Sequence, residues 1–498
     1  MPATDTIAAI STPPGRGGIG IVRLSGPDAQ AYAERLVRLH QTLEHGRARL
    51  ADVYDPGFVA GDNDDQASND EACASEGRID EALVTFFAAP NSYTGDDLVE
   101  IAAHGSPVVL NTILQAALAL GARLAEPGEF TQRAFLSGRL DLTQAEAVRD
   151  LIEAQTLAQA RLAATQMGGA LSRRVLPVKH ALLELIALLE AGIDFAEDDL
   201  AVAPDAEITA RIATVREPLT ALAATFAHGR ILHDGLTLAI VGRPNAGKSS
   251  LFNALIQRDR AIVTAQPGTT RDTVSERIAL DGIPLELVDT AGLREAHDEA
   301  ERLGIARSRE ALADAAIVLV VLDGAAMSRR ESAETAGAVF PKAAALPEED
   351  RLLLASLQGR PALVAWNKTD LAPEFAPGYA AFDASPLANE LKSYGTPVHA
   401  TSAVSGQGIA DLRRAIVSLA TGGAAAEPGM LTSVRHHQAI ETALRGLDDA
   451  QAAVTGGIPH EMILLDLYRT LWALDSLTGQ TTPDDILNLI FSTFCIGK

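Results

Sequence analysis

The stretch Gly242-Arg-Pro-Asn-Ala-Gly247-Lys248-Ser249 decides how the middle of this chain folds. It directly follows Leu-Thr-Leu-Ala-Ile-Val at 236–241, an apolar run that is typical of a buried parallel strand. The pattern GxxxxGKS between a strand and a helix predicts a phosphate-binding loop (P-loop), in which backbone N–H groups surround the β-phosphate. Lys248 would reach the β- and γ-phosphate oxygens, and the Ser249 hydroxyl would bind Mg²⁺.

Three later motifs each follow a predicted strand, at 285–288, 362–366 and 398–400. In Asp289-Thr-Ala-Gly292, the carboxylate can hold Mg²⁺ through water and the last amide can sense a γ-phosphate. In Asn367-Lys-Thr-Asp370, the carboxylate can accept from both N1–H and the exocyclic amine of guanine, a donor pair that adenine lacks. Ser402-Ala403 would close over the base. Because ligands of doubly wound sheets bind at the carboxyl ends of strands, four motifs in this order predict a guanine-nucleotide site.

Leu293 stands where many GTPases carry the glutamine that positions the attacking water, so hydrolysis must use another device. Residues 262–272 occupy the position of a switch loop, in which Thr270 is the expected ligand of Mg²⁺ and the γ-phosphate. The full set of residues expected to contact GTP is Asn245, Ala246, Gly247, Lys248, Ser249, Ser250, Thr264, Ala265, Gln266, Pro267, Gly268, Thr269, Thr270, Asp289, Thr290, Ala291, Gly292, Asn367, Lys368, Thr369, Asp370, Ser402, Ala403 and Val404.

Length and composition bound the rest of the protein. A chain of 498 residues exceeds one hydrophobic core, and we expect about three domains. No apolar run reaches the roughly 20 residues that span a bilayer, no secretory signal opens the chain, and only Cys73 and Cys495 are present, so we expect a cytoplasmic protein without a membrane association. A net charge of −24 would repel a nucleic acid, so RNA binding would need a local basic patch or a basic partner protein.

The first 140 residues mix strand and helix patterns. Strands are predicted at 19–24, 83–87 and 98–102, and a helix at 108–120 that Gly121 ends. The acidic stretch 62–80 has no periodicity and is interpreted as a disordered surface insertion.

Two later stretches are helical. Thr143 and Glu146 form the pattern of a capping box, and the apolar positions 147, 151, 154 and 158 continue one helix from it. A second helix would stop at Gly192, and after residue 425 helices are predicted around 433–455 and before Gly479. Each stretch has an apolar stripe that needs a partner, so we expect the two to pack together and the residues between them to be an inserted domain.

The sequence therefore predicts a multidomain protein. Its parts are an α+β amino-terminal domain at 1–140, a discontinuous α-helical domain at 141–230 and 425–498, and an inserted α/β G domain with a Ras-like doubly wound sheet at 231–424.

Nearly the whole chain resembles the tRNA-modification GTPase family called MnmE or TrmE. The pieces that carry the resemblance are GRPNAGKSSLFNAL at 242–255, GTTRD at 268–272, DTAGLRE at 289–295, FSTFCIGK at 491–498, PPGRGGIGIVRLSG at 13–26, PNSYTGDD at 90–97 and PGEFTQRAFLSGRLDLTQAEA at 127–147. The family's architecture, a G domain inserted between two halves of a helical domain, agrees with the division above.

The resemblance implies a catalytic device in place of the missing glutamine. In this family a K⁺ ion supplies the missing charge, and the matching ligands are Asn245, Thr264, the carbonyl of Gln266 and Thr269. Glu301 matches the acidic residue that positions the attacking water indirectly, and with Lys248 and Thr270 it completes the expected catalytic set. Without the resemblance, Glu301 is typical of a solvated helix carboxylate. The G domains of a homodimer would meet face to face in the transition state.

The resemblance also implies a cofactor site in the amino-terminal domain, which in this family dimerises and binds 5-formyl- or 5,10-methylene-tetrahydrofolate. The matching positions are Arg23, Glu100, Arg139 and Lys498. Relatives often carry Lys at position 139, so the cation is retained with a different geometry.

The function implied by the resemblance is the installation of an aminomethyl or carboxymethylaminomethyl group at C5 of the wobble uridine of certain tRNAs. The protein would act in a hetero-oligomer with an FAD-dependent partner that resembles MnmG, and GTP hydrolysis would drive a conformational cycle. The G motifs fit a second hypothesis equally well, a GTP switch in ribosome assembly without a role in modification chemistry.

Overall fold

The computed structural model describes residues 5–55, 77–194, 204–256, 275–289, 315–328, 346–374, 376–423, 427–480, 487 and 490–497. Contacts divide the chain into two compact units. The first comprises Met1–Arg149, Gln166–Ile208 and Arg445–Lys498, and the second comprises Asp150–Thr165 and Thr209–Leu444. The domain boundaries at 140, 230 and 424 stay a prediction.

The first unit contains a seven-stranded sheet in the order β3-β4-β5-β6-β2-β1-β7. Its strands are β1 (Ile7–Ile10), β2 (Gly17–Ser25), β3 (Val37–Leu39), β4 (Ala48–Tyr54), β5 (Arg78–Phe87), β6 (Leu98–Gly105) and β7 (Arg123–Leu124). The helices α1 (Ala29–Leu36) and α2 (Pro107–Ala119) pack on one face, against alternate buried residues such as Val22 and Ile101. The three predicted strands and the helix that Gly121 ends are confirmed. β5 begins at Arg78, so the carboxyl end of the insertion predicted at 62–80 is wrong, and residues 62–76 lie outside the described part of the chain.

The other face of this sheet is covered only in part. α3 (Glu129–Leu136) covers the β1 side, where Phe130 packs with Ile7 and Leu98. Farther along, register places the residues of one transverse row side by side on this face, in the order Leu50, Leu83, Ala102 and Ile21. Leu50 is 46% exposed and Leu83 is 50% exposed, so this row is an apolar surface open to solvent.

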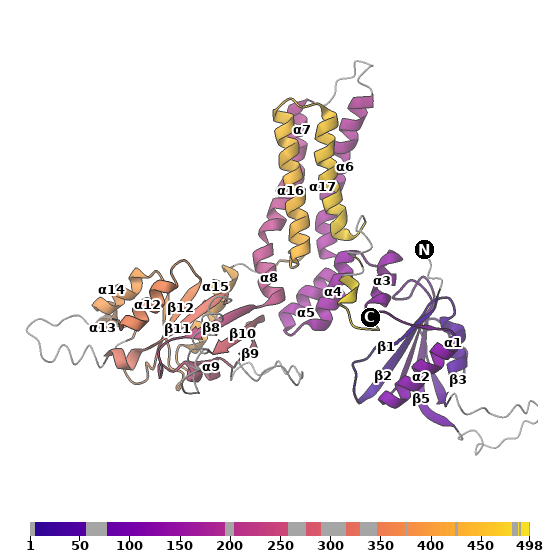
Figure 1. Ribbon diagram of the computed structural model, residues 1–498, viewed down its shortest axis with the longest axis horizontal. Coiled ribbons are helices and arrows are strands. Elements are labelled where there is room, and N and C mark those ends of the chain that lie inside the picture. The colour runs from indigo at the N-terminus through magenta and orange to yellow at the C-terminus, as the bar shows by residue number, and fades with distance from the viewer. Residues whose placement is uncertain are drawn as a thin grey trace, which may run out of the picture. The chain divides into compact units, whose positions relative to one another are not determined.

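Two long helices of the first unit come from distant parts of the sequence. α6 (Ala170–Asp194) and α17 (His460–Thr478) lie side by side (Figure 1). Lys179 of α6 pairs with Asp475 of α17 at 2.5 Å. α6 continues through Gly192, so the predicted stop at that residue is wrong. Gly479, with φ +89°, ends α17 as predicted.

The helix predicted from residue 143 is divided into two. α4 (Leu142–Glu153) begins with a capping box two residues earlier than expected, because the Asp141 carboxylate accepts from the Gln144 N–H and the Gln144 side chain accepts from the Asp141 N–H. α5 (Leu157–Met167) begins with its own box, in which Thr156 and Gln159 exchange the same contacts. The expected box of Thr143 and Glu146, and the single helix through 158, are therefore wrong.

The second unit contains a six-stranded sheet in the order β13-β12-β11-β8-β10-β9, parallel except for the β9–β10 pair. Its strands are β8 (Leu236–Val241), β9 (Ser275–Leu280), β10 (Ile283–Asp289), β11 (Ile317–Asp323), β12 (Ala362–Asn367) and β13 (Val398–Ala400). α9 (Lys248–Ile256) and α15 (Ile409–Thr421) cover one face. α12 (Glu348–Ser356), α13 (Ala380–Asp383) and α14 (Pro386–Ser393) cover the other. This is a doubly wound α/β sheet, and the predicted multidomain fold class is confirmed.

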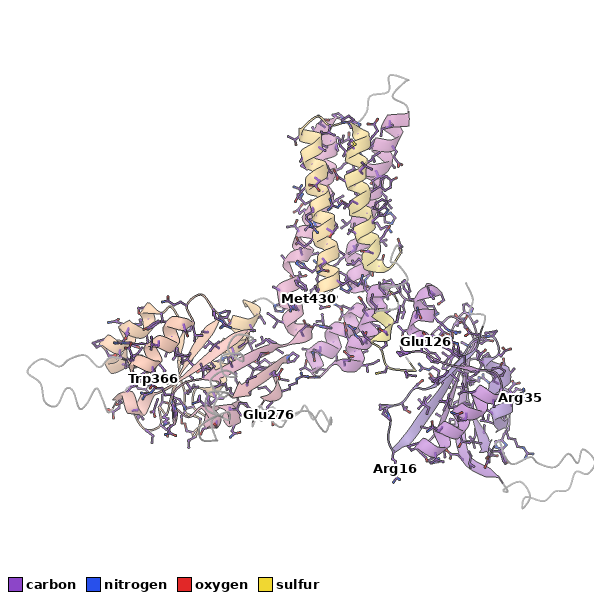
Figure 2. All side chains as sticks on the ribbon, in the orientation of Figure 1. Arg16, Arg35, Glu126, Glu276, Trp366 and Met430 are labelled. Atoms are coloured by element: carbon purple, nitrogen blue, oxygen red, sulfur yellow. The ribbon has the colours of Figure 1, made fainter. Side chains whose placement is uncertain are left out.

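The β9–β10 hairpin rests on helices of its own unit. A Cβ added to Gly282, in the hairpin turn, would lie 2.9 Å from the Cβ of Ala158 in α5. Ile283 packs with Leu232 of α8 (Phe226–Asp234) and with Met430, which Figure 2 labels. The remaining described helices are α7 (Asp205–Ala224) and α16 (Val434–Thr455). No described helix has the length and apolarity that crossing a bilayer requires.

Candidate functional site

The P-loop follows β8 directly, and its backbone explains its glycines. Gly242 has φ +147°, and a Cβ there would lie 2.3 Å from the carbonyl oxygen of Val321 in the neighbouring strand. Gly247 has φ +96°, and a Cβ there would lie 2.3 Å from the side-chain nitrogen of Asn367. Both positions therefore exclude other residues. α9 starts at Lys248, so its free backbone N–H groups face the loop.

Lys248 is buried and folds back over the loop. Its Nζ donates to the carbonyl oxygens of Gly242 at 2.9 Å and Arg243 at 2.8 Å. These contacts hold a cation among the carbonyl oxygens of the loop. Ser249 and Ser250 follow, both exposed in the first turn of α9.

The motif after β12 is bonded to the P-loop. Asn367 donates from Nδ2 to the Ala246 carbonyl at 3.0 Å, and its Oδ1 accepts from the Ala403 N–H at 3.2 Å. Lys368 donates from Nζ to the Asn245 carbonyl at 2.5 Å and to Asp323 Oδ2 at 2.6 Å. Three of the four predicted motifs thus meet through direct hydrogen bonds.

Asp370 contacts the Ser402-Ala403 motif. Ser402 Oγ donates to Asp370 Oδ1 at 2.6 Å, and Asp370 is exposed. Thr369 is buried and donates to the Thr401 carbonyl at 3.0 Å, while Val404 is 85% exposed. Ser402 fixes one oxygen of the Asp370 carboxylate, and the residue is open to solvent. It is thus able to accept a pair of donors from a planar base.

Sequence reasoning missed Asp323 as part of this arrangement. It directly follows the buried run 317–322, and its carboxylate holds Lys368 in place. An acidic residue at the carboxyl end of an apolar strand was the available signal. Trp366, fully buried in β12 and labelled in Figure 2, packs edge-on against Phe382 beneath the site.

Several predicted site residues lie outside the described part of the chain. They are Thr264, Ala265, Gln266, Pro267, Gly268, Thr269, Thr270, Thr290, Ala291, Gly292, Leu293, Glu301 and Lys498. For Asp289 the backbone alone is described, at the end of β10, where it pairs with Ile240.

A second cluster lies in the first unit, around Arg23 of β2. Arg23 and Glu100 of β6 are register partners, and Nε and Nη2 of Arg23 donate to Glu100 Oε1 at 3.0 and 2.6 Å. The Arg23 guanidinium carbon lies 5.9 Å from the ring centre of Tyr93 and 5.7 Å from that of Phe130. This cation thus has an anionic partner at its edge and aromatic faces beside it.

The carboxyl-terminal tail reaches the same cluster. Ile496 pairs with Pro127, and the Gly128 N–H donates to the Cys495 carbonyl at 3.4 Å. Gly497, with φ +91°, lies so close to β1 that a Cβ there would be 2.7 Å from the Ile10 carbonyl oxygen. The Gly497 carbonyl accepts from Arg23 Nη1 at 3.4 Å. Residues 23, 100 and 497, far apart in sequence, are therefore neighbours.

Arg139 is placed less directly. It is exposed, and its Nη1 donates to the carbonyl of Pro90 at 3.2 Å, at the start of the loop that carries Tyr93. Among the described contacts, none joins Arg139 to Arg23 or Glu100.

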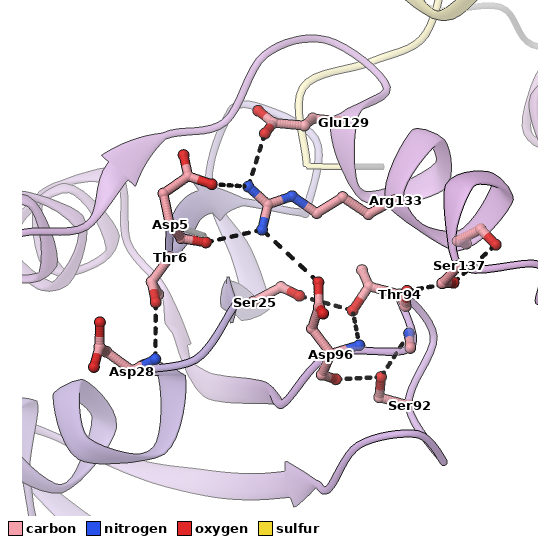
Figure 3. A network of polar contacts seen from close by, with 12 residues as sticks. Asp5, Thr6, Ser25, Asp28, Ser92, Thr94, Asp96, Glu129, Arg133 and Ser137 are labelled. Carbon is pink, nitrogen blue, oxygen red and sulfur yellow. Dashed lines mark hydrogen bonds and ion pairs between the residues drawn. The ribbon is translucent and has the colours of Figure 1, made fainter. Parts of the chain in front are cut away.

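A partly buried polar network adjoins this cluster (Figure 3). Arg133 of α3 donates to the backbone carbonyl of Asp5 at 3.0 Å, to Asp5 Oδ1 at 2.8 Å and to Glu129 Oε1 at 3.0 Å. Burial by itself would raise the pKa of Glu129, but hydrogen bonds from Arg123, the Glu126 N–H and Arg133 outweigh burial and lower it. Glu129 thus remains ionised and pairs with Arg123 and Arg133.

Comparison with known proteins gives two matching family models. "MnmE helical domain" matches residues 142–495, and "GTP-binding protein TrmE N-terminus" matches residues 6–139. A "tRNA modification GTPase MnmE" of Koribacter versatilis is 52% identical over 502 residues, covering 100% of both chains. One of the same name from Symbiobacterium thermophilum is 42% identical over 495 residues, covering 99% of both. Among solved structures, the G domain of the T. maritima FeoB iron transporter is 27% identical, with a TM-score of 0.24, covering 37% of this chain and 98% of that one.

Proposed function

Because this chain belongs to the MnmE family of tRNA modification GTPases, we propose that it hydrolyses GTP as part of the modification of the wobble uridine in certain tRNAs. The observation that carries the GTP part is the bonding of three motifs at one edge of the second sheet. Asn367 and Lys368 bind the P-loop backbone, and Ser402 orients Asp370. A site assembled in this way presents phosphate donors and a guanine acceptor together.

The P-loop lysine supplies the main phosphate contact. The Lys248 ammonium binds two carbonyl oxygens of its own loop. A triphosphate would offer that ammonium charged oxygens instead, and charge-assisted hydrogen bonds are roughly twice as strong as neutral ones. Asp370 would select guanine because adenine leaves its carboxylate without the paired donors.

The metal ligands follow from the oxygen chemistry of the loop. Mg²⁺ would be held by Ser249 and Thr270, and it would neutralise charge on the β- and γ-phosphates. The exposed hydroxyl of Ser249 at the start of α9 fits this role. K⁺ would be held by the set named above from the family resemblance, in which Asn245 is exposed and offers an amide oxygen. Glu301 would orient the attacking water in place of glutamine.

The cluster around Arg23 is proposed to bind 5-formyl- or 5,10-methylene-tetrahydrofolate, the one-carbon donor. Arg23 and Glu100 together offer guanidinium donors and a carboxylate, which suit the carbonyl and amino groups of a pteridine. The tail that contacts Arg23 through Gly497 would bring Lys498 to the same cluster. Arg139, which contacts Pro90, would join them through a shift of its long side chain.

The apolar surface of the first sheet and the net charge of the chain support two proposed partners. The open apolar row of the first sheet, from Leu50 to Ile21, supports a homodimer through the amino-terminal domain. An FAD-dependent partner resembling MnmG would complete the hetero-oligomer. Because the chain carries a net charge of −24, that partner would provide most of the basic surface that tRNA needs.

Nucleoside mass spectrometry of tRNA from a deletion strain tests the function. We expect the aminomethyl and carboxymethylaminomethyl groups at C5 of the wobble uridine to disappear and to return when the wild-type chain is supplied. Unchanged wobble uridines, together with an accumulation of ribosome precursors, would replace the proposal with a GTP switch in ribosome assembly.

A further inference from the structure

We propose that Tyr93 is a positioning residue of the amino-terminal site, which holds the Arg23 guanidinium in the orientation that a folate needs. The inference rests on the proposed folate site. The Arg23 guanidinium carbon lies over the rings of both Tyr93 and Phe130, with centre distances of 5.9 and 5.7 Å. The ring faces attract the cation and restrict its tilt, whereas Glu100 bonds its edge.

Tyr93 is itself held in place by a hydrogen bond of its hydroxyl. Its hydroxyl shares a hydrogen bond of 2.9 Å with the Thr131 hydroxyl, on the residue after Phe130 in α3. Burial raises the pKa of Tyr93, so the phenol stays neutral and keeps this bond at physiological pH. The two rings beside Arg23 are therefore tied to one helix.

The loop that carries Tyr93 is pinned at the next residue. Thr94 Oγ1 lies 2.7 Å from Ser25 Oγ of β2, and the Thr94 carbonyl accepts from Ser137 Oγ at 2.8 Å (Figure 3). Gly95 donates to Ser92 Oγ at 3.0 Å within the loop. These contacts attach the loop to the strand that carries Arg23 and to the end of α3.

The orientation of Arg23 matters because its donors are few. A guanidinium has five N–H groups. Three contacts to Glu100 and Gly497 are formed among the described residues. At most two donors are then left for a ligand, and their direction depends on the plane of the group. Without the Tyr93 ring, this plane could turn about the single Glu100 oxygen, and the remaining donors would no longer point to one place.

Binding of 5-formyltetrahydrofolate to the full-length protein tests this role by calorimetry. We expect Tyr93→Leu to weaken binding roughly tenfold, which corresponds to the loss of one partly desolvated cation–π contact. Tyr93→Phe keeps the ring and should stay within about twofold of wild type. Tyr32→Leu is the matched control, since Tyr32 is a half-buried ring in the same sheet core, in α1, away from Arg23.

A second readout follows Arg23 without any folate. The Nε–H resonance of Arg23, assigned by its disappearance in Arg23→Lys, should be shifted by the ring currents in wild type. It should shift measurably in Tyr93→Leu, although Glu100 and Phe130 still contact Arg23 there, and stay in place in Tyr93→Phe and Tyr32→Leu. If wild type binds no folate while this pattern holds, the folate proposal fails and the positioning role stands. An Arg23 resonance that is unchanged in Tyr93→Leu overturns the positioning role.

A double-mutant comparison separates positioning from general stability. If Tyr93 acts through Arg23, Tyr93→Leu should add little to the loss of folate affinity that Arg23→Lys causes alone. Full additivity of the two losses, or an equal loss in Tyr32→Leu, would mean that Tyr93 contributes only to the core.

Discussion

Asn245 and Lys368 adopt a backbone conformation that non-glycine residues avoid, with φ of +65° and +66°. Such a conformation costs about 1 kcal/mol for each residue. It persists here because Lys368 bonds the Asn245 carbonyl and is held by Asp323. Strain of this kind at two contacting positions indicates that the site requires these side chains rather than glycine.

The strain at Asn245 suggests a sharp test of the K⁺ proposal. Asn245→Gly relieves the backbone and keeps the carbonyl that Lys368 binds, but it removes the amide oxygen. We expect GTP affinity within about threefold of wild type and a loss of the preference for K⁺ over Na⁺ in hydrolysis. Turnover should be measured in both salts at equal ionic strength. A variant that retains the wild-type ratio of the two rates would exclude Asn245 as a ligand.

Asp370→Asn tests whether the Asp370 carboxylate selects guanine. The amide would meet the guanine donors with an NH₂ group, so GTP affinity should fall about 100-fold, whereas xanthosine triphosphate, which offers an acceptor at that position, should gain. Competition binding with both nucleotides measures this exchange. Ser402→Ala is the companion variant, because it frees Asp370 while keeping the carboxylate, and it should weaken GTP only a few-fold.

At the scale of elements, periodic segments were predictable and short ones were not. The helix at 108–120 and the strands at 236–241 and 362–366 were evident from their apolar patterns and the turn residues that follow them, whereas the buried strand β11 was not predicted. β1, β3 and α1 were missed because four, three and eight residues carry too little pattern. The break between α4 and α5 could have been found, since Thr156-Leu-Ala-Gln159 is a capping sequence.

The site was predictable where one local segment carries the chemistry. The P-loop and the Asn367–Asp370 motif are each a single short segment of the sequence, so residue types and spacing were sufficient to predict them. Arg23, Glu100 and Gly497 come from three separate segments, and only sheet register and the tail's close approach to β1 bring them together. Periodicity does not encode such an assembly, and here it came from family resemblance.

One ion pair between two helices should make the stability of the protein depend on pH. His233 at the end of α8 pairs with Asp150 of α4 at 3.1 Å and with Asp234 at 2.6 Å, and a hydrogen bond to Asp150 is the main cause that raises its pKa to about 9. A raised folded-state pKa stabilises the fold fully below pH 6.5, and this contribution is lost as pH rises through about 9.

Asp150→Asn tests this ion pair by calorimetric melting between pH 6 and 9.5. We expect the variant to be less stable than wild type by roughly 1–2 kcal/mol at pH 6, with the difference shrinking toward pH 9.5. Asp234→Asn, which removes the secondary partner, should have a smaller effect. A difference between Asp150→Asn and wild type that is independent of pH would contradict the assignment.

At the scale of the whole molecule, the β9–β10 hairpin connects nucleotide chemistry to helices. Its strands lead to the stretches expected to contact the γ-phosphate, and six cross-strand residue pairs make it a stiff unit. Its turn lies against Ala158. A displacement of either strand end should therefore reach α5.

Hydrogen exchange measures that displacement. We expect the amides of 157–167 to exchange at different rates with a non-hydrolysable GTP analogue and with GDP, because the hairpin turn presses on α5 in one state more than in the other. The helix α2, in the other unit, is the internal control and should not change. Equal exchange of α5 in both states would exclude the hairpin as the connection.

The pairing of α6 with α17 has a consequence for biosynthesis. About 265 residues separate the end of α6 from the start of α17. At roughly 5–20 residues per second, a ribosome needs tens of seconds to supply the second helix after the first has emerged. During that interval α6, which carries the buried residues Leu182, Leu185 and Leu189, lacks its partner helix α17, while the P-loop sheet can already form. The nucleotide-binding part is thus synthesised and able to fold before the second of the two helices that flank it in the sequence is complete. Chaperones would be needed most by nascent chains that end between α6 and α17.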